Sequence, residues 1–193
     1  ERTCGGYGGP MAGLLDAIDD KLAQWLQAQP VFFVATAPRS DDGLVNLSPK
    51  GMAGTFSVID DHTVAYLDLT GSGVETIAHL RENGRIVLMF CAFSGRPTIV
   101  RLHGRGRAVL PGSAEFEGLI GRFSEHPGVR SVIVVDVART STSCGYAVPT
   151  MSYEADRDVL DLSAAKRGPE GLADYRREKN ATSLDGLPGL PLS

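Results

Sequence analysis

The segment Tyr66-Leu-Asp-Leu-Thr-Gly-Ser-Gly-Val-Glu-Thr-Ile-Ala-His-Leu-Arg-Glu-Asn-Gly84 predicts a strand, a tight glycine turn and a helix in direct succession. Ser72 and Glu75 have the S-x-x-E spacing of a capping box, so the helix is expected to start there and to end at Asn83-Gly84. Apolar residues at helical spacing form its expected inward stripe: Val74, Ile77, Ala78 and Leu80. One face of the predicted strand carries Tyr66, Asp68 and Thr70.

This turn is a candidate phosphate site. A helix N-terminus presents unpaired backbone N–H groups and the positive end of the helix dipole, and glycines let an anion come close to the backbone. Thr70, Ser72 and Gly73 are the residues expected to line it. Glu75 opposes an anion unless the capping box turns its carboxylate back, and an ordinary capped helix has the same spacing.

A second informative stretch is Leu44-Val-Asn-Leu-Ser-Pro-Lys-Gly51. In an extended chain Asn46, Ser48 and Lys50 share one face, and a hydroxyl with an ammonium group suits a phosphate. Pro49 cannot donate to a strand ladder, which predicts an edge strand that a ligand can reach. The alternative is a polar edge that only faces solvent.

The order of elements predicts a mainly β fold. A helix containing Leu14 to Leu26 comes first and a second one carries Phe116 to Phe123. A last helix is expected at 170–179, opened by Gly168-Pro169. Six strands are expected, at 31–37, 44–51, 64–70, 85–93, 98–110 and 131–138. Most links are too short for parallel crossovers, so we expect a six-stranded antiparallel split β-barrel with flanking helices.

Composition narrows the function classes. The chain has 193 residues, a net charge of −4 and three cysteines. A nucleic-acid footprint, a membrane span, a disulfide framework and a metal site are therefore not expected, and a reducing cytoplasm fits. Residues 1–10 are glycine-rich and are interpreted as a leader or an added extension, whereas 11–193 are expected to form a single domain.

No catalytic residue is assigned from the sequence. Arg101, His103, Arg105 and Arg107 share one face of the long strand 98–110, which either meets an anionic ligand or is a hydrated sheet face. His103 is a candidate general acid, because an imidazole ordinarily titrates near neutrality, but no second catalytic group lies beside it in the sequence. Cys144 is interpreted as a structural thiol. The glycine pair at 104 and 106 predicts a bulge or bend in this strand.

Four stretches in fixed order resemble the pyridoxamine 5'-phosphate oxidase-like family of FMN-binding split β-barrels: Phe32-Phe-Val-Ala-Thr-Ala-Pro38, Val45-Asn-Leu-Ser-Pro-Lys-Gly51, Leu67 to Gly84 and Val100-Arg-Leu-His-Gly-Arg-Gly106. The resemblance implies a homodimer with FMN sites at the interface. It places the FMN phosphate near Ser48, Lys50, Thr70, Ser72 and Gly73, with Tyr66 and Asp68 toward the ring or ribityl chain. Many relatives carry a basic or amide side chain where this chain has Val74, so Arg81 and Arg101 are candidates to compensate.

The resemblance implies an FMN-dependent oxidoreductase that acts on an unknown small molecule. The alternatives are a reductase that uses the deazaflavin coenzyme and a flavin-binding or carrier protein without turnover. Members that oxidise vitamin B6 carry an Arg/Trp-rich C-terminal segment, whereas this chain ends in a Pro/Gly-rich tail from Leu184. Vitamin B6 oxidation is therefore not expected, and the tail is expected to lie on a surface, such as that of a partner subunit.

Overall fold

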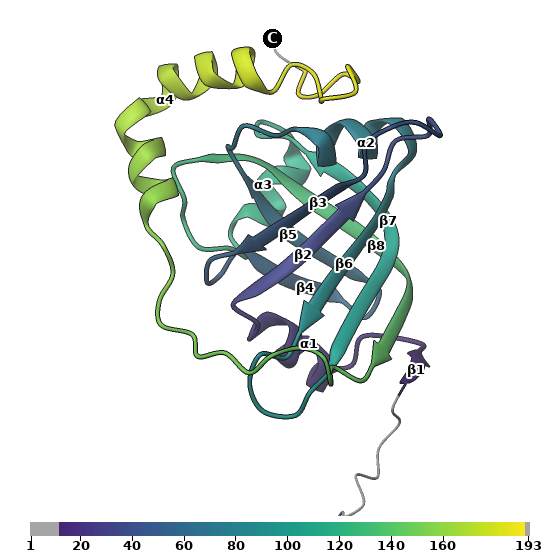
Figure 1. Cartoon of the computed structure of the whole chain (residues 1–193). Coiled ribbons are helices and arrows are strands. Elements are labelled where there is room, and N and C mark those ends of the chain that lie inside the picture. The colour runs from purple at the N-terminus through teal and green to yellow at the C-terminus, as the bar shows by residue number, and fades with distance from the viewer. Residues whose placement is uncertain (1–11, 192–193) are drawn as a thin grey trace, which may run out of the picture.

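The computed structural model describes residues 12–191. The expected extension at 1–10 lies outside this range. The helices are α1 Asp20–Gln27, α2 Glu75–Asn83, α3 Ala114–Ile120 and α4 Val159–Lys179 (Figure 1). The strands are β1 Ala12–Leu15, β2 Val31–Thr36, β3 Asn46–Gly51, β4 Phe56–Asp60, β5 Thr63–Leu69, β6 Arg85–Cys91, β7 Ile99–Val109 and β8 Val129–Ser143.

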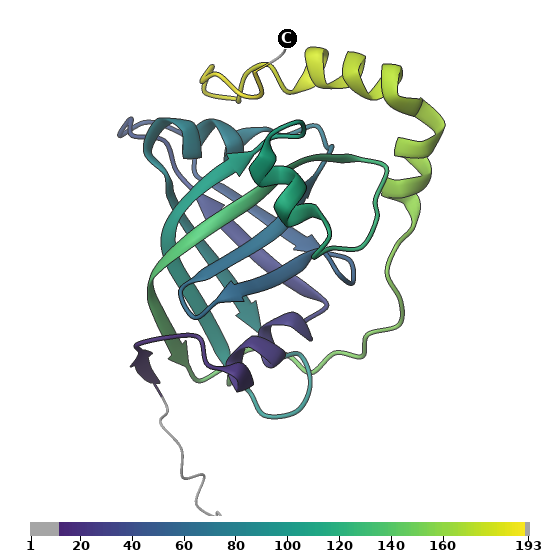
Figure 2. The same ribbon diagram turned by 180° about the vertical axis from the view of Figure 1, so that it is seen from behind.

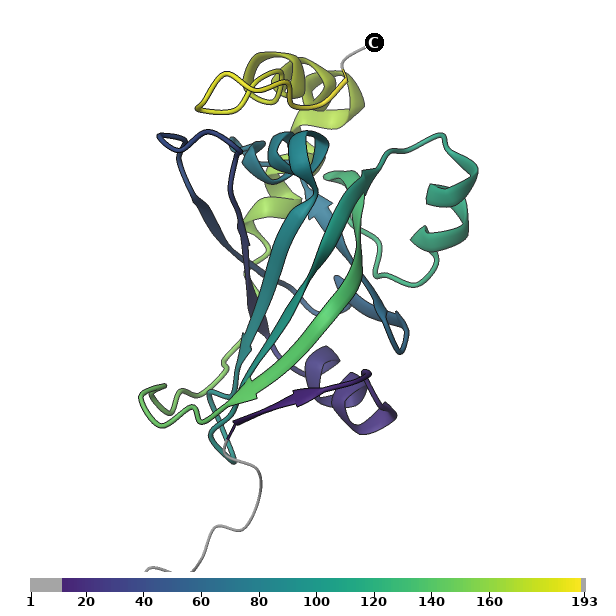
Figure 3. The ribbon, with the colours of Figure 1, turned by 90° about the vertical axis from the view of Figure 1, so that its right-hand side faces the viewer.

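All eight strands belong to one antiparallel sheet in the order β3-β2-β6-β7-β8-β5-β4, with β1 paired to β8. The sheet curls into a half-barrel, with α1 near one end and α2 near the other (Figure 3). The predicted antiparallel split β-barrel is confirmed, and β3 is an edge strand as Pro49 indicated. The structure adds β1 and β4 to the six expected strands, since both are short segments that pair with only one neighbour.

The barrel interior is filled by aromatic and aliphatic side chains. Phe32 stacks on Phe90, with ring centroids 5.2 Å apart, and meets Tyr66 edge to face at 5.5 Å. Ile77 and Leu80 of α2 belong to the same core, so α2 closes the barrel end where β5 finishes. A second cluster lies on the outer face of β5 and β8, where α3 covers it (Figure 2).

The first helix is shorter than predicted. Leu14 and Leu15 lie in β1 and are exposed, and the helix begins only after Asp19, whose Oδ1 accepts from the Leu22 backbone N–H at 2.7 Å. The two leucines fit the helical spacing by coincidence. Pairing of β1 with β8 along Thr140–Ser143 overrides that pattern.

The capping box predicted for α2 does not form. Val74 occupies the N-cap without a side-chain hydrogen bond, and the helix begins at Glu75. The Glu75 carboxylate instead accepts from the Leu184 backbone N–H at 3.4 Å. The predicted stop is confirmed, because Gly84 takes the left-handed conformation (φ 69°) that ends the helix.

The C-terminal part differs most from expectation. The strand predicted to end at 138 continues to Ser143, and the last helix begins at Val159 with a break at Gly168-Pro169. Its second half and the tail pass over the barrel end that carries α2 (Figure 1). The tail packs on its own chain: Leu190 is buried, and a Cβ at Gly189 would lie 2.9 Å from both Val74 methyl groups.

The register of β7 and β8 shifts between His103 and Gly104, but the additional residue, Ala138, lies on β8 and not on β7, where the bulge or bend was expected. The close approach of the two strands at Gly104 yields a stability prediction. A Cβ on Gly104 would lie 2.2 Å from the backbone oxygen of Asp136 on β8. Gly104→Ala is therefore expected to lower the free energy of unfolding by about 2 kcal/mol, because the backbones must separate. The matched control is Gly118→Ala in α3, where a Cβ meets open space and a gain of about 0.5 kcal/mol is expected. Urea unfolding of both variants measures this, and equal effects would contradict it.

Candidate functional site

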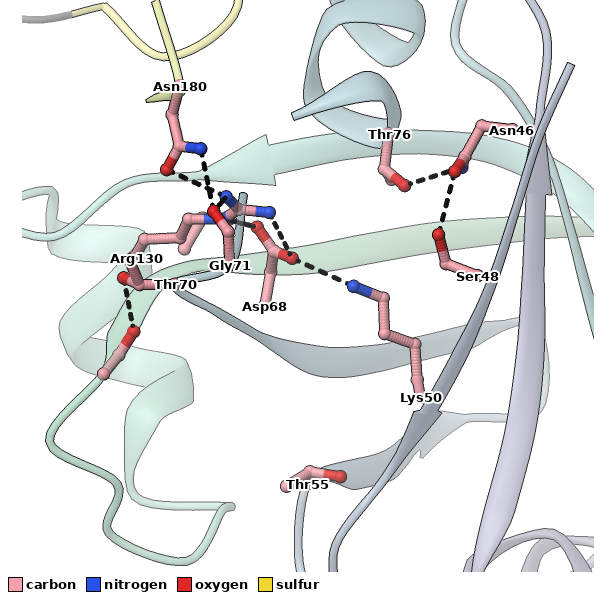
Figure 4. A network of polar contacts seen from close by, with 12 residues as sticks. Asn46, Ser48, Lys50, Thr55, Asp68, Thr70, Gly71, Thr76, Arg130 and Asn180 are labelled. Atoms are coloured by element: carbon pink, nitrogen blue, oxygen red, sulfur yellow. Dashed lines mark hydrogen bonds and ion pairs between the residues drawn. The ribbon is translucent and has the colours of Figure 1, made fainter. Parts of the chain in front are cut away.

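The two stretches that the sequence marked as phosphate candidates face each other in space (Figure 4). On β3, the Asn46 side-chain amide donates to Thr76 Oγ1 at the start of α2 at 3.1 Å, and it accepts from Ser48 Oγ at 2.8 Å. Lys50 Nζ lies 3.4 Å from Asp68 Oδ1 on β5. The split between β3 and the β5–α2 turn is therefore bridged by polar side chains.

Asp68 is the centre of this polar cluster. It is fully buried, and Arg130 at the start of β8 donates from Nε to its Oδ2 at 2.6 Å and from Nη2 to its Oδ1 at 3.2 Å. Ser131 Oγ donates a further hydrogen bond to Oδ2 at 3.1 Å. Arg130 and Asp68 therefore form a bidentate ion pair, the geometry in which a guanidinium group binds a carboxylate most strongly.

The charge state of Asp68 follows from competing effects. Burial raises the pKa of the carboxyl, but the charges of Arg130 and Lys50, with the hydrogen bonds from Arg130 and Ser131, outweigh burial and hold the pKa below its ordinary value. Asp68 is therefore an anion at neutral pH. Its charge fixes the ammonium group of Lys50 at the mouth of the split.

The end of α4 completes the cluster from above. Asn180 is buried, accepts from Arg130 Nη1 at 3.0 Å and donates to the Gly71 backbone oxygen at 2.9 Å. Arg176 donates from Nε to Thr70 Oγ1 and from Nη2 to the Val129 backbone oxygen, both at 2.9 Å. The last turn of α4 is thus hydrogen-bonded to the strand-to-helix turn more than a hundred residues earlier in the chain.

The structure separates the predicted site residues into two groups. Ser48 and Lys50 are partly exposed at the split, and Ser72 and Gly73 are exposed on the turn, so a ligand can reach all four. Thr70 is buried, and its hydroxyl already donates to the Gly128 backbone oxygen at 2.8 Å.

Tyr66 and Asp68 are fully enclosed by their own chain, so direct contact with a ligand outside the barrel is not available to either. The Tyr66 hydroxyl has no hydrogen-bond partner within residues 12–191, and burial, with the charge of Asp68, raises its pKa well above the ordinary value. Tyr66 is therefore a core residue in this structure, and Asp68 acts through Lys50 and Arg130.

Arg81 and Arg101 were expected to compensate for Val74, but the side chain of each bonds elsewhere and not at the β5–α2 turn. Arg81 donates to the Gly189 backbone oxygen of the tail, and Arg101 bonds Ser143 Oγ at 3.0 Å near the far end of β7. His103 is exposed on the same strand face, where burial and the charges of Arg139 and Arg101 lower its pKa. Arg105 and Arg107 of the same strand also bond within the chain, to the Asn83 backbone oxygen and to the Glu115 carboxylate.

Five residues of the cluster are not among those expected from the sequence: Thr76, Arg130, Ser131, Arg176 and Asn180. Arg130 directly precedes the apolar run that defines the strand expected at 131–138, so it lies just outside the expected strand. Arg176 lies four residues after Leu172, an apolar residue of the helix expected at 170–179, and this spacing places both on one helix face. That spacing was the available signal for Arg176.

Comparison with known proteins identifies the class. Residues 18–144 match the family model described as pyridoxamine 5'-phosphate oxidase. Pyridoxamine 5'-phosphate oxidase family protein ustO from Aspergillus flavus is 36% identical over 193 residues, which cover 91% of this chain and 76% of that protein. The chain therefore belongs to the pyridoxamine 5'-phosphate oxidase family, and the resemblance seen in its motifs is confirmed.

Solved structures with a similar chain fold are more distant. HupZ from Group A Streptococcus is 22% identical with a TM-score of 0.49, covering 64% of this chain and 91% of that one. A FAD-binding protein from Mesorhizobium loti is 15% identical with a TM-score of 0.47, covering 68% of this chain and 96% of that one.

Within residues 12–191, no helix is both long and apolar enough to cross a membrane, and no three His, Cys, Asp or Glu side chains group as metal ligands.

Proposed function

We propose that this chain is an FMN-binding flavoprotein and that it works as an oxidoreductase on a small molecule. The observation that carries the proposal is the excess of positive charge at the split. Lys50, Arg130 and Arg176 all interact with one buried carboxylate, Asp68. When the Glu75 carboxylate at the start of α2 is counted as well, one positive charge remains in excess. A phosphate monoester carries a charge of about −1.5 to −2 at pH 7, so the donor set fits the FMN phosphate.

Each residue of the site has a distinct task in this proposal. Lys50 and Ser48 bind the phosphate directly, because their side chains are reachable and lie on one face of β3. Asp68 orients Lys50 through the 3.4 Å contact, and Arg130 keeps Asp68 charged. The bound flavin would supply hydride and electron transfer, while the protein provides binding, orientation and control of solvent access.

The first experiment is an absorption spectrum of the purified protein, recorded before and after addition of excess FMN and desalting. About one flavin per chain is expected to remain bound. Reduction by NADH or NADPH would then support an oxidoreductase, whereas stable flavin without reduction by either would favour a carrier. A colourless protein that instead binds the deazaflavin coenzyme, or neither, would overturn FMN as the cofactor.

We further propose that two copies of the chain associate through the outer face of β3. Val45 and Leu47 are 73% and 65% exposed, on the face opposite Ser48 and Lys50, and Leu44 beside them is 55% exposed. An apolar edge next to a charged site is costly in water, and a second copy of the same edge would cover it. In such a dimer the cofactor site would adjoin the interface.

Leu47→Lys tests this association. It is expected to raise the dimer dissociation constant at least about tenfold, because a charge would be buried between two apolar edges. Leu14→Lys is the control, since Leu14 is equally exposed (62%) but lies on β1 rather than on this edge. Sedimentation velocity over a range of concentrations measures both variants. A monomeric wild-type protein, or a Leu47→Lys variant that dimerises unchanged, would contradict the proposal.

A further inference from the structure

The strand-to-helix turn contains no basic side chain of its own. Residues 70–74 read Thr-Gly-Ser-Gly-Val, and Glu75 adds a negative charge at the helix start. An anion bound here needs a cation from elsewhere in the fold, because backbone N–H groups alone must compete with the Glu75 carboxylate. Lys50 supplies one from the β3 side.

Arg176 is the cation that approaches from the opposite side. Its Nε and Nη2 bond Thr70 Oγ1 and the Val129 backbone oxygen, which fixes the guanidinium plane beside the turn. Within the described part of the chain no carboxylate forms an ion pair with Arg176, and its side-chain hydrogen bonds come from Nε and Nη2, which leaves Nη1 without a partner there. Arg130, by contrast, is neutralised by the two-pronged contact with Asp68.

Holding Arg176 in this position has an energetic cost. Burial and repulsion from Arg130 lower its pKa, and attraction to Asp68 recovers only part of that cost. A half-buried guanidinium group beside a second one is stabilised when an anion binds between or above them. Arg176 therefore has the position, the free donor and the uncompensated charge of a residue that binds an anion.

We propose that Arg176, carried by the last turn of α4, binds the FMN phosphate and supplies the cation missing at the position of Val74. This inference rests on the proposed flavin function and adds a residue to it. The C-terminal helix would then be part of the cofactor site. Asn180, one turn further on, anchors the helix through Arg130 and Gly71 and holds Arg176 in place.

The test compares FMN with riboflavin, which has the same ring system and no phosphate. The flavin-free protein is titrated with each, following quenching of flavin fluorescence. Arg176→Gln is expected to raise the FMN dissociation constant about tenfold or more, as for loss of a charge-assisted hydrogen bond, and to change that of riboflavin by less than about threefold. Arg176→Lys keeps the positive charge but loses the planar set of guanidinium donors. Its FMN dissociation constant is expected to lie between those of the wild type and Arg176→Gln.

The control is Arg177→Gln, at the adjacent position. Arg177 is exposed and pairs with Asp174 on the helix surface, so neither flavin should bind differently. Unchanged FMN affinity in Arg176→Gln, or equal weakening of FMN and riboflavin, would overturn the assignment of Arg176 while leaving the flavin function standing. A wild-type protein that binds neither flavin would overturn both. Far-UV circular dichroism and the melting temperature of each variant show whether α4 remains docked.

Discussion

Arg130→Met is expected to lower the free energy of unfolding by about 3 kcal/mol, the largest change we predict for a single substitution in this chain. Methionine keeps much of the side-chain volume but leaves Asp68 fully buried without its main counter-charge. Lys50 remains 3.4 Å away and offsets part of the loss, which sets the expected value at the lower end of the range for broken buried ion pairs. Urea-induced unfolding followed by circular dichroism measures it.

A double variant separates the ion pair from simple packing. With Asp68→Asn added to Arg130→Met, no buried charge is left unpaired, so the double variant is expected to be more stable than Arg130→Met alone. Lys179→Met is the surface control, because Lys179 pairs with exposed Glu178 and its loss should change stability by less than about 0.5 kcal/mol. An Arg130→Met variant as stable as the wild type would show that Asp68 does not depend on Arg130.

Lys50→Ala is expected to weaken FMN binding at least about tenfold while the fold stays intact. The ammonium group is the reachable cation on β3, with its side chain 22% exposed, and Asp68 holds it in place. Loss of Lys50 leaves Asp68 bonded to Arg130 and Ser131, so the barrel should keep its stability within about 1 kcal/mol. Fluorescence titration with FMN and thermal unfolding measure the two quantities on the same samples.

Two lysine variants serve as controls for this experiment. Lys50→Arg keeps a cation on β3 and should retain more affinity than Lys50→Ala. Lys21→Ala removes an exposed lysine on α1, at the other end of the barrel, and should change nothing. Flavin affinity that is unchanged in Lys50→Ala would remove Lys50 from the phosphate site.

Local patterns predicted much of this architecture. Side chains alternate between the two faces of an extended strand, so Ser48 and Lys50 share one face of β3 whatever the neighbouring strands are. The inward stripe of α2 and its stop at Gly84 likewise depend on residues within one or two turns. Short links between strands were enough to predict an antiparallel barrel.

What the sequence did not reveal depends on contacts between distant segments. Arg130 is 62 positions from Asp68, and Arg176 is 106 positions from Thr70, so no window of neighbouring residues contains either interaction. The capping box expected at Ser72 and Glu75 does not form for a related reason. Glu75 finds its hydrogen-bond donor in the tail at Leu184, which competes with the local partner that the spacing suggested.

The return of α4 to the turn after β5 has a consequence for when the proposed cofactor could bind. Half of the cluster, from Asn46 to Asp68, is synthesised early, but Arg176 and Asn180 emerge from the ribosome only after all eight strands. A nascent barrel would therefore present an incomplete polar cluster. Stable loading with flavin would follow translation of the last helix rather than accompany the folding of the sheet.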